Sequence, residues 1–141
     1  LVLATGSEVQ LALGARDELE AAGVPTRVVS MPCLEWFEDQ DDAYRESVLP
    51  SSVRARVSVE AGVAQGWWKY LGTDGRAVSL EHFGASAAAP VLFREFGFTV
   101  ENVVAKAHET LVAAGRPARP GRPPPGALIP GGEQDVAGNP H

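Results

Sequence analysis

Apolar and polar residues follow two different periods along the chain, and these periods predict strands and helices in turn. Short runs rich in β-branched residues, "LVLAT", "TRVVSM", "RARVSVEAG" and "AVSLEHFG", are typical of strands in a covered sheet. Helical spacing predicts helices over residues 7–22 and 41–48, one that starts near Pro90 or one turn earlier, and a last one that ends at Gly115. We therefore expect a mostly parallel sheet covered by helices on both faces, a three-layer α/β/α Rossmann-like fold.

The first and last helices carry the clearest apolar stripes. The stripe of the last helix follows its N-cap Thr99, whereas the first helix has two candidate capping boxes, Ser7 with Gln10 and Thr5 with Glu8. Both boxes fit the sequence, so it allows two starts for this helix that are two residues apart. The stripe residues are Leu11, Ala15, Leu19 and Ala22 in the first helix, and Val100, Val103, Val104, Ala107 and Leu111 in the last.

Composition divides the chain into two parts. A hydrophobic content of 45% is enough to build one core, and a length of 141 residues is too short for two ordinary domains. From Arg116 onward, 7 Pro and 5 Gly stand among 26 residues, so we expect one domain over 1–115 and a disordered tail over 116–141. Leu1 stands directly inside an apolar run, which we interpret as a cut in a longer sequence.

Charge and cysteine content exclude several classes of protein. A net charge of -6 without clustered Lys and Arg argues against a nucleic-acid partner. No apolar run approaches the roughly 20 residues that span a bilayer, so no membrane association is expected. Cys33 is the only cysteine, which excludes an internal disulfide and suits a reducing compartment. We therefore expect a cytoplasmic protein.

The turn "ATGSEV" is the first candidate site. A helix that starts after a parallel strand offers free N–H groups and a positive dipole end, so Gly6, Ser7 and Glu8 form a possible anion or regulatory site. The turn has one glycine where a dinucleotide loop would have three, and Glu8 would compete with a phosphate for the same N–H groups. A structural turn is the favoured interpretation.

Few other side chains indicate chemistry. Glu60 follows the third strand, where an acid or base of an α/β enzyme stands, but a carboxylate that caps a helix or pairs across a domain contact is favoured. Cys33 has no basic neighbour in sequence and is expected to be inert. The histidines His82, His108 and His141 belong to no catalytic motif. The sequence thus predicts no catalytic residue, no metal ligand and no cofactor-binding residue.

An aromatic cluster stands in "GWWKYLG". Trp67, Trp68 and Tyr70 favour burial in the core or against another domain, because Trp and Tyr dominate interfaces. At least one of the two adjacent tryptophans is expected to face outward. Together with Glu60, these three residues are possible interdomain contacts.

In this order and spacing, "ATGSEV", "RVVSMP", "QDDAYRESVLP", "SVEAG", "FGASA" and "FGFT" closely resemble the carboxyl-terminal domain of transketolase, from Leu1 to about Leu111. The resemblance implies the third domain of a homodimeric transferase of the pentose phosphate or Calvin pathway. The parent enzyme moves a two-carbon ketol unit between sugar phosphates with thiamine diphosphate and Mg2+ or Ca2+. Its cofactor and substrate residues lie in the amino-terminal domains, and none of those motifs stands in this chain.

Two functions follow from the resemblance. The first is a structural and assembly domain, inactive by itself, that packs on the remaining domains of transketolase. The alternative is a free-standing regulatory module that binds a nucleotide or sugar phosphate. The residues that match the family's third domain are Gly6, Ser7, Glu8, Arg27, Ser30, Pro32, Tyr44, Arg45, Glu60, Gly62, Gly84 and Ser86.

The resemblance also implies the strand order 2-1-3-4 and an antiparallel strand before "ATGSEV", without which the edge at "RVVSM" is unpaired. The chain departs from the family at three places. Pro90 stands two positions later than usual, Cys33 stands where serine is common, and the Pro/Gly-rich tail has no counterpart.

Overall fold

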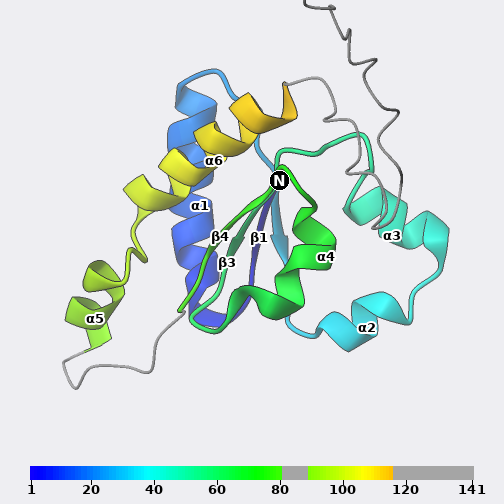
Figure 1. Cartoon of the computed structure of the whole chain (residues 1–141), viewed down its shortest axis with the longest axis horizontal. Helices are drawn as coiled ribbons and strands as arrows, with labels where there is room; N and C mark the ends of the chain where they lie inside the picture. Colours follow the sequence, from blue (N-terminus) through cyan, green and yellow to red (C-terminus); the bar gives the residue numbers. More distant parts are fainter. Residues whose placement is uncertain (81–88, 116–141) are drawn as a thin grey trace, which may run out of the picture.

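The computed structural model describes residues 1–80 and 89–115, and the polypeptide there forms a four-stranded sheet (Figure 1). All three strand pairings are parallel and the strand order is β2-β1-β3-β4, which confirms the predicted sheet and its order. Each strand is shorter than its apolar run: β1 is Val2–Ala4, β2 is Val28–Ser30, β3 is Val57–Val59 and β4 is Arg76–Val78.

Helices cover both faces of the sheet, as predicted. Figure 1 shows α1 and α6 on one side of the strands and α2, α3 and α4 on the other. The helices, with two 3-10 turns labelled η, are η1 Gly6–Glu8, α1 Val9–Ala21, α2 Leu34–Glu38, α3 Asp42–Val48, η2 Ala64–Trp67, α4 Trp68–Leu71, α5 Ala89–Glu95 and α6 Val100–Ala114.

Successive residues of each strand enter two different cores. Val2, Ala4, Val57 and Val59 pack under α1 and α6 in a core that we call the aliphatic face. Leu3 points the other way, into a core that we call the aromatic face. Its buried members are Leu3, Met31, Leu49, Trp67, Tyr70 and Leu71. The period of two in a strand thus divides a small protein into two separate cores.

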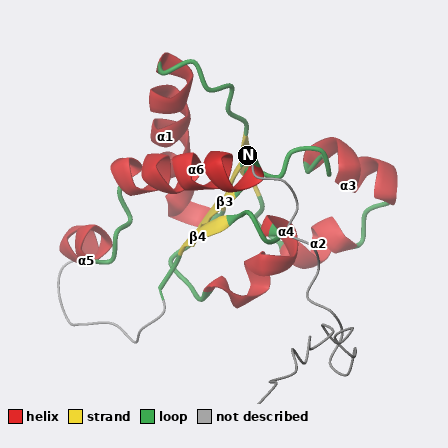
Figure 2. Ribbon diagram, turned by 45° about the horizontal axis from the view of Figure 1, so that its top comes forward, coloured by secondary structure: helices red, strands yellow, loops and turns green. Residues whose placement is uncertain are grey.

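The aliphatic face is closed by the crossing of α6 over α1, which Figure 2 shows. A Cβ built on Gly14 of α1 would lie 2.8 Å from Cγ2 of Val100, so the helices approach closely because residue 14 lacks a side chain. Thr99 caps α6 as predicted, its hydroxyl accepting the N–H of Asn102.

Both predicted stripes are wrong at their ends. Leu111 is 41% exposed, and Thr110 is buried instead, with its hydroxyl donating to the carbonyl of Ala107. In α1 the buried residues are Ala12, Ala15 and Leu19, whereas Ala22 is exposed. In each case the sheet, which the periodicity does not include, decides which side of the last turn is covered.

Neither predicted capping box forms at the start of the first helix. Thr5 is the N-cap of η1 and Glu8 the N-cap of α1, and neither side chain accepts a backbone N–H there. The expectation of a side-chain cap is wrong because a 3-10 turn inserts three residues between strand and helix, and carries Glu8 into the interior.

On the opposite face, α3 matches its prediction, with Asp41 as N-cap to the N–H of Tyr44. Two helices there, α2 and the α4 turn, were not predicted, because elements of four or five residues are too short to show a helical period.

Strand β2 is at the edge of the sheet, as the resemblance implies. Val28 packs on the aliphatic face and Val29 on the aromatic face, both only partly buried. The predictions for His82, Gly84, Ser86 and the tail lie outside the described residues. The helix expected near Pro90 begins at Ala89.

Candidate functional site

The turn at Gly6 has the position of an anion site but holds its own carboxylate. Gly6 has φ 60°, a left-handed conformation that favours glycine, and Glu8 is 6% exposed. The hydroxyl of Ser7 donates to Oε1 of Glu8 at 3.2 Å. The other carboxylate oxygen, Oε2, lies 3.5 Å from the position of a Cβ on Gly6. The buried side chain of Glu8 therefore folds back against the turn, and a ligand role for Gly6, Ser7 and Glu8 stays a prediction.

The structure brings together two of the predicted interdomain residues. Glu60 leaves the end of β3, and its Oε2 accepts the indole N–H of Trp67, which is 2% exposed. This bond gives the buried indole the acceptor that it requires. Glu60 therefore anchors the η2 turn, and among residues 1–80 and 89–115 it neither caps a helix nor forms an ion pair.

The "GWWKYLG" cluster divides by burial. Trp67 and Tyr70 are 2% and 6% exposed, and both belong to the core of this chain. Trp68 is 49% exposed, so the expectation that one tryptophan faces outward is confirmed. An interdomain role stays a prediction, and Trp68 has the surface for it, because the other two rings are already covered within the chain.

A charged network ties α4 to α2 and α3. The hydroxyl of Tyr70 and the ammonium of Lys69, at 2.9 Å, both donate to Oε1 of Glu38, and Arg45 stands 3.9 Å from Oε2. The hydrogen bond from the Tyr70 hydroxyl is the largest cause that holds the pKa of Glu38 below its usual range, and the hydrogen bond from Lys69 is the second. The pKa of Tyr70 is raised, chiefly by its burial and secondly by its hydrogen bond to Glu38. Both shifts favour a charged Glu38 carboxylate and a neutral Tyr70 hydroxyl at neutral pH.

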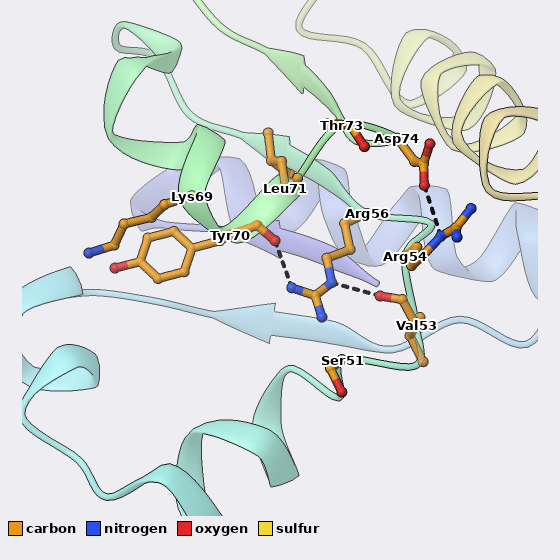
Figure 3. A pocket seen from close by; sticks show the side chains of 10 residues that line it. Ser51, Val53, Arg54, Arg56, Lys69, Tyr70, Leu71, Thr73 and Asp74 are labelled. Atoms are coloured by element: carbon orange, nitrogen blue, oxygen red, sulfur yellow. Dashed lines mark hydrogen bonds and ion pairs between the residues drawn. The ribbon is translucent and has the colours of Figure 1, made fainter. Parts of the chain in front are cut away.

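Arg56 joins four backbone carbonyl groups, and Figure 3 shows its bonds to two of them, those of Tyr70 and Val53. Its guanidinium donates to Tyr70 and Pro50 at 2.7 Å each, to Val53 at 2.7 Å and to Leu49 at 3.2 Å. Burial lowers its pKa, and within the described residues it forms no ion pair. Arg56 thus fastens the end of α3 to α4.

A cavity of about 290 Å³ opens beside this arginine. Figure 3 shows Lys69 and Arg54 at its rim, the first engaged with Glu38 and the second with Asp74 at 2.9 Å. All three cations therefore have partners, and four of the five N–H groups of Arg56 are used. This arrangement holds the fold together, because the charged side chains among the described residues that line the cavity are all engaged within the chain.

A second hollow lies along the exposed edge of the sheet, with a volume of about 310 Å³. We call it the aromatic groove; its walls include Val29, Met31, Trp36, Phe37, Gln40 and Tyr44. Trp36 is 70% exposed and Tyr44 is 50% exposed. This surface was not predicted, although three aromatic residues stand among the acids of "EWFEDQDDAY".

The remaining candidate residues in the described part of the chain are Cys33 and His108. The Cys33 thiol is partly exposed in the aromatic groove and donates to Glu35 at 3.3 Å. His108 is exposed on α6. Within residues 1–80 and 89–115, no three His, Cys, Asp or Glu side chains gather closely enough to hold a metal ion. No helix of those ranges has the length and apolarity to cross a membrane.

Comparison with known proteins gives one consistent result. The family model of the transketolase-like TK C-terminal domain matches residues 1–99. Transketolase 1 of Escherichia coli (strain K12) and transketolase 2 of Pasteurella multocida (strain Pm70) are each 60% identical over 111 residues. A solved transketolase from Leishmania mexicana superimposes with a TM-score of 0.75 at 45% identity, over 84% of this chain and 17% of that one.

The matches to the two curated relatives cover 79% of this chain and 17% of each relative. The chain therefore spans about a sixth of the length of the curated relatives it matches.

Proposed function

Because the chain belongs to the family of transketolase-like C-terminal domains, we propose that it serves as the structural and assembly domain of a transketolase and is inactive by itself. The observation that carries this proposal is the use of its polar side chains. Glu60, Glu38 and Arg56 all bind groups of the chain itself, which holds the helices of the aromatic face in place.

The proposed parent enzyme transfers a two-carbon ketol unit between sugar phosphates in the cytoplasm. The described residues do not fit its thiamine diphosphate or its Mg2+ or Ca2+. They gather no metal-binding cluster, and the buried side chain of Glu8 lies against the Gly6 turn, where a diphosphate at this helix N-terminus would have to stand. We assign the cofactor, the metal and the substrate to the parts of a transketolase outside this chain.

The proposed partners are the remaining transketolase domains and, through them, a second subunit. Trp68 supports this part of the proposal. Its ring is half exposed and stands next to the buried Trp67, so the core fixes its backbone while the ring remains available. A rigidly held aromatic ring suits the centre of an interface.

The direct test is a ketol-transfer assay of the purified chain with thiamine diphosphate, magnesium, xylulose 5-phosphate and an acceptor aldose. We expect no turnover above the rate without protein. Turnover that rises with the concentration of the chain would overturn the proposed inactivity.

The assembly role needs a hybrid enzyme, in which residues 1–111 replace the matching part of the Escherichia coli transketolase. We expect an active hybrid, and we expect Trp68→Glu to weaken its assembly in analytical ultracentrifugation. Lys106→Glu, on the helix of the opposite face, is the matched control. Equal assembly of both variants would remove Trp68 from the interface, and a folded but unassembled hybrid would contradict the assembly role.

A further inference from the structure

The segment of residues 32–48, which carries α2 and α3, differs in burial from its surroundings. No residue of the segment is buried, and this includes both helices. Buried residues stand directly at its two ends, Met31 before it and Leu49 after it. Because a segment without buried side chains removes little apolar surface from water, the hydrophobic effect holds it only weakly to the sheet.

Several hydrogen bonds of the segment start and end within it. In α2, the side chain of Gln40 donates to the carbonyl of Trp36 at 3.0 Å. In α3, Asp41 accepts the N–H of Tyr44 at 2.7 Å, and the hydroxyl of Ser47 donates to the carbonyl of Tyr44 at 2.6 Å. Such bonds stay formed when the segment moves as a body, so they do not oppose its movement.

Among the described residues, side-chain hydrogen bonds and ion pairs join this segment to the rest of the chain at two places. The first is its C-terminal end, where Arg27 donates to the carbonyls of Ser47 and Val48. At the same end, Glu46 accepts from the hydroxyl of Ser51 at 2.9 Å. Because these groups stand close to the buried end of the segment, they can stay bonded while α2 moves away.

The second place is Glu38, at the end of α2. Its carboxylate accepts from Tyr70 and Lys69 of α4. Beside it, the ring of Phe37 meets the ring of Tyr70 edge-on, with 5.8 Å between centroids. Leu34 and Phe37 are the side chains of α2 that pack, partly buried, against the aromatic face. One carboxylate and a small apolar contact therefore hold α2 in place.

A hollow of about 520 Å³ lies beside this contact. Its walls come from α2, α3 and α4 and include Phe37, Glu38, Arg45, Lys69 and Tyr70. Figure 1 shows α2 and α3 at the outside of the molecule, with α4 between them and the strands. The space beneath the two helices is thus only partly filled, which leaves the bonds of Glu38 as the main polar tie between α2 and α4.

We propose that residues 32–48 form a flap that swings off the aromatic face as one unit, about Met31 and Leu49, while the sheet and the aliphatic face stay folded. The bonds of Glu38 to Tyr70 and Lys69 hold this flap closed. Opening uncovers the ring of Tyr70 and the apolar side of α2, so the chain can expose an apolar surface without unfolding.

Native-state hydrogen exchange of the full chain, followed residue by residue by NMR, tests the flap. The amides of Phe37, Asp39 and Arg45, whose hydrogen bonds lie inside it, should have protection factors at least about tenfold lower than those of β1 and β3. Glu38→Gln should speed exchange at all three by at least about threefold, because it weakens the bonds to α4. Glu35→Gln, on the same helix but outside these bonds, is the matched control and should change none of them.

Two further variants complete the test. Lys69→Met removes a donor to Glu38 from the other side and should act on the flap amides as Glu38→Gln does. Val103→Ala, on the aliphatic face, should speed exchange in β1 and β3 by about tenfold, because it destabilises the fold as a whole. The flap amides should keep their rates in Val103→Ala, since the open and closed states both retain the aliphatic face.

One common factor for flap and strands in Val103→Ala would show that the segment opens only with the whole fold, and would overturn the proposal. A response to Glu38→Gln at Phe37 but not at Arg45 would show that α3 does not move with α2, and would overturn it as well. Unchanged flap rates in both Glu38→Gln and Lys69→Met would refute the role of Glu38. These measurements are independent of the proposed transketolase role, because they involve neither catalysis nor assembly.

Discussion

The two faces of the sheet are built by different means. The aliphatic face has two long helices that cross at Gly14, and its buried residues are mostly valine, alanine and leucine. The aromatic face has short helices of four to seven residues, and its core centres on Trp67 and Tyr70. Ion pairs and hydrogen bonds to Glu60, Glu38 and Arg56 hold those short helices.

This difference shows that one small sheet can hold its helices in two ways, by apolar packing on one face and by polar bonds on the other. Long helices bury a continuous stripe and need few polar bonds. Short helices bury little, so charged side chains must fix them, and they leave aromatic rings such as Trp36 and Trp68 at the surface. We therefore expect packing changes to affect the aliphatic face, and charge or pH changes to affect the aromatic face.

The largest expected effect separates two adjacent tryptophans of the aromatic face. Trp67→Ala should lower the free energy of unfolding by about 3–5 kcal/mol, because it empties a buried site and leaves Glu60 without its donor. Trp68→Ala, the matched control, should cost under about 1 kcal/mol. Urea denaturation followed by circular dichroism measures both values; a similar loss in the two variants would contradict the division of the cluster.

A smaller effect is expected on the aliphatic face. Gly14→Leu should cost roughly 1–3 kcal/mol, because any side chain at this position meets Val100 at the helix crossing. The same change in a Val100→Ala background should cost less, since the crossing then has room. Thermal unfolding of the four variants measures the coupling, and its absence would show that α1 and α6 do not approach closely at residue 14.

The smallest effect is expected from pH, and we locate it at the Glu38 network of the aromatic face. The Glu38 carboxylate has a lowered pKa in the fold, chiefly through the Tyr70 hydroxyl. Its contribution to stability is therefore present above the ordinary glutamate pKa of about 4.3 and is lost as the pH falls through the lower folded value. Urea titrations should show Glu38→Gln less sensitive to acid than the parent chain. Gln40→Glu, which keeps Glu38, is the control; identical acid profiles for Glu38→Gln and the parent would refute a role for this carboxylate.

Long elements were predictable because a period repeats often enough to be detected. The last helix was located from Thr99 to Gly115 by its stripe and cap, and α3 was predicted over residues 41–48 by its helical spacing. Elements of four or five residues, such as α2 and α4, show less than two helical turns, so the aromatic groove that α2 lines was not expected.

The candidate side chains were predictable by type and not by role. Glu60 was expected to act as an acid, a cap or a domain contact, and its partner is Trp67, seven residues away in an unpredicted turn. Arg56 had no signal in the sequence, because its four acceptors are backbone carbonyl groups that any residue provides.

The sequence alone determined the alternation of strands and helices, the two-sided sheet and the family, because these depend on local periods and on motifs read in order. The tertiary structure decided which face each aromatic ring occupies, the inward turn of Glu8 and the carbonyl contacts of Arg56. Those outcomes depend on distances between segments far apart in the chain, and local propensity carries no information about such distances.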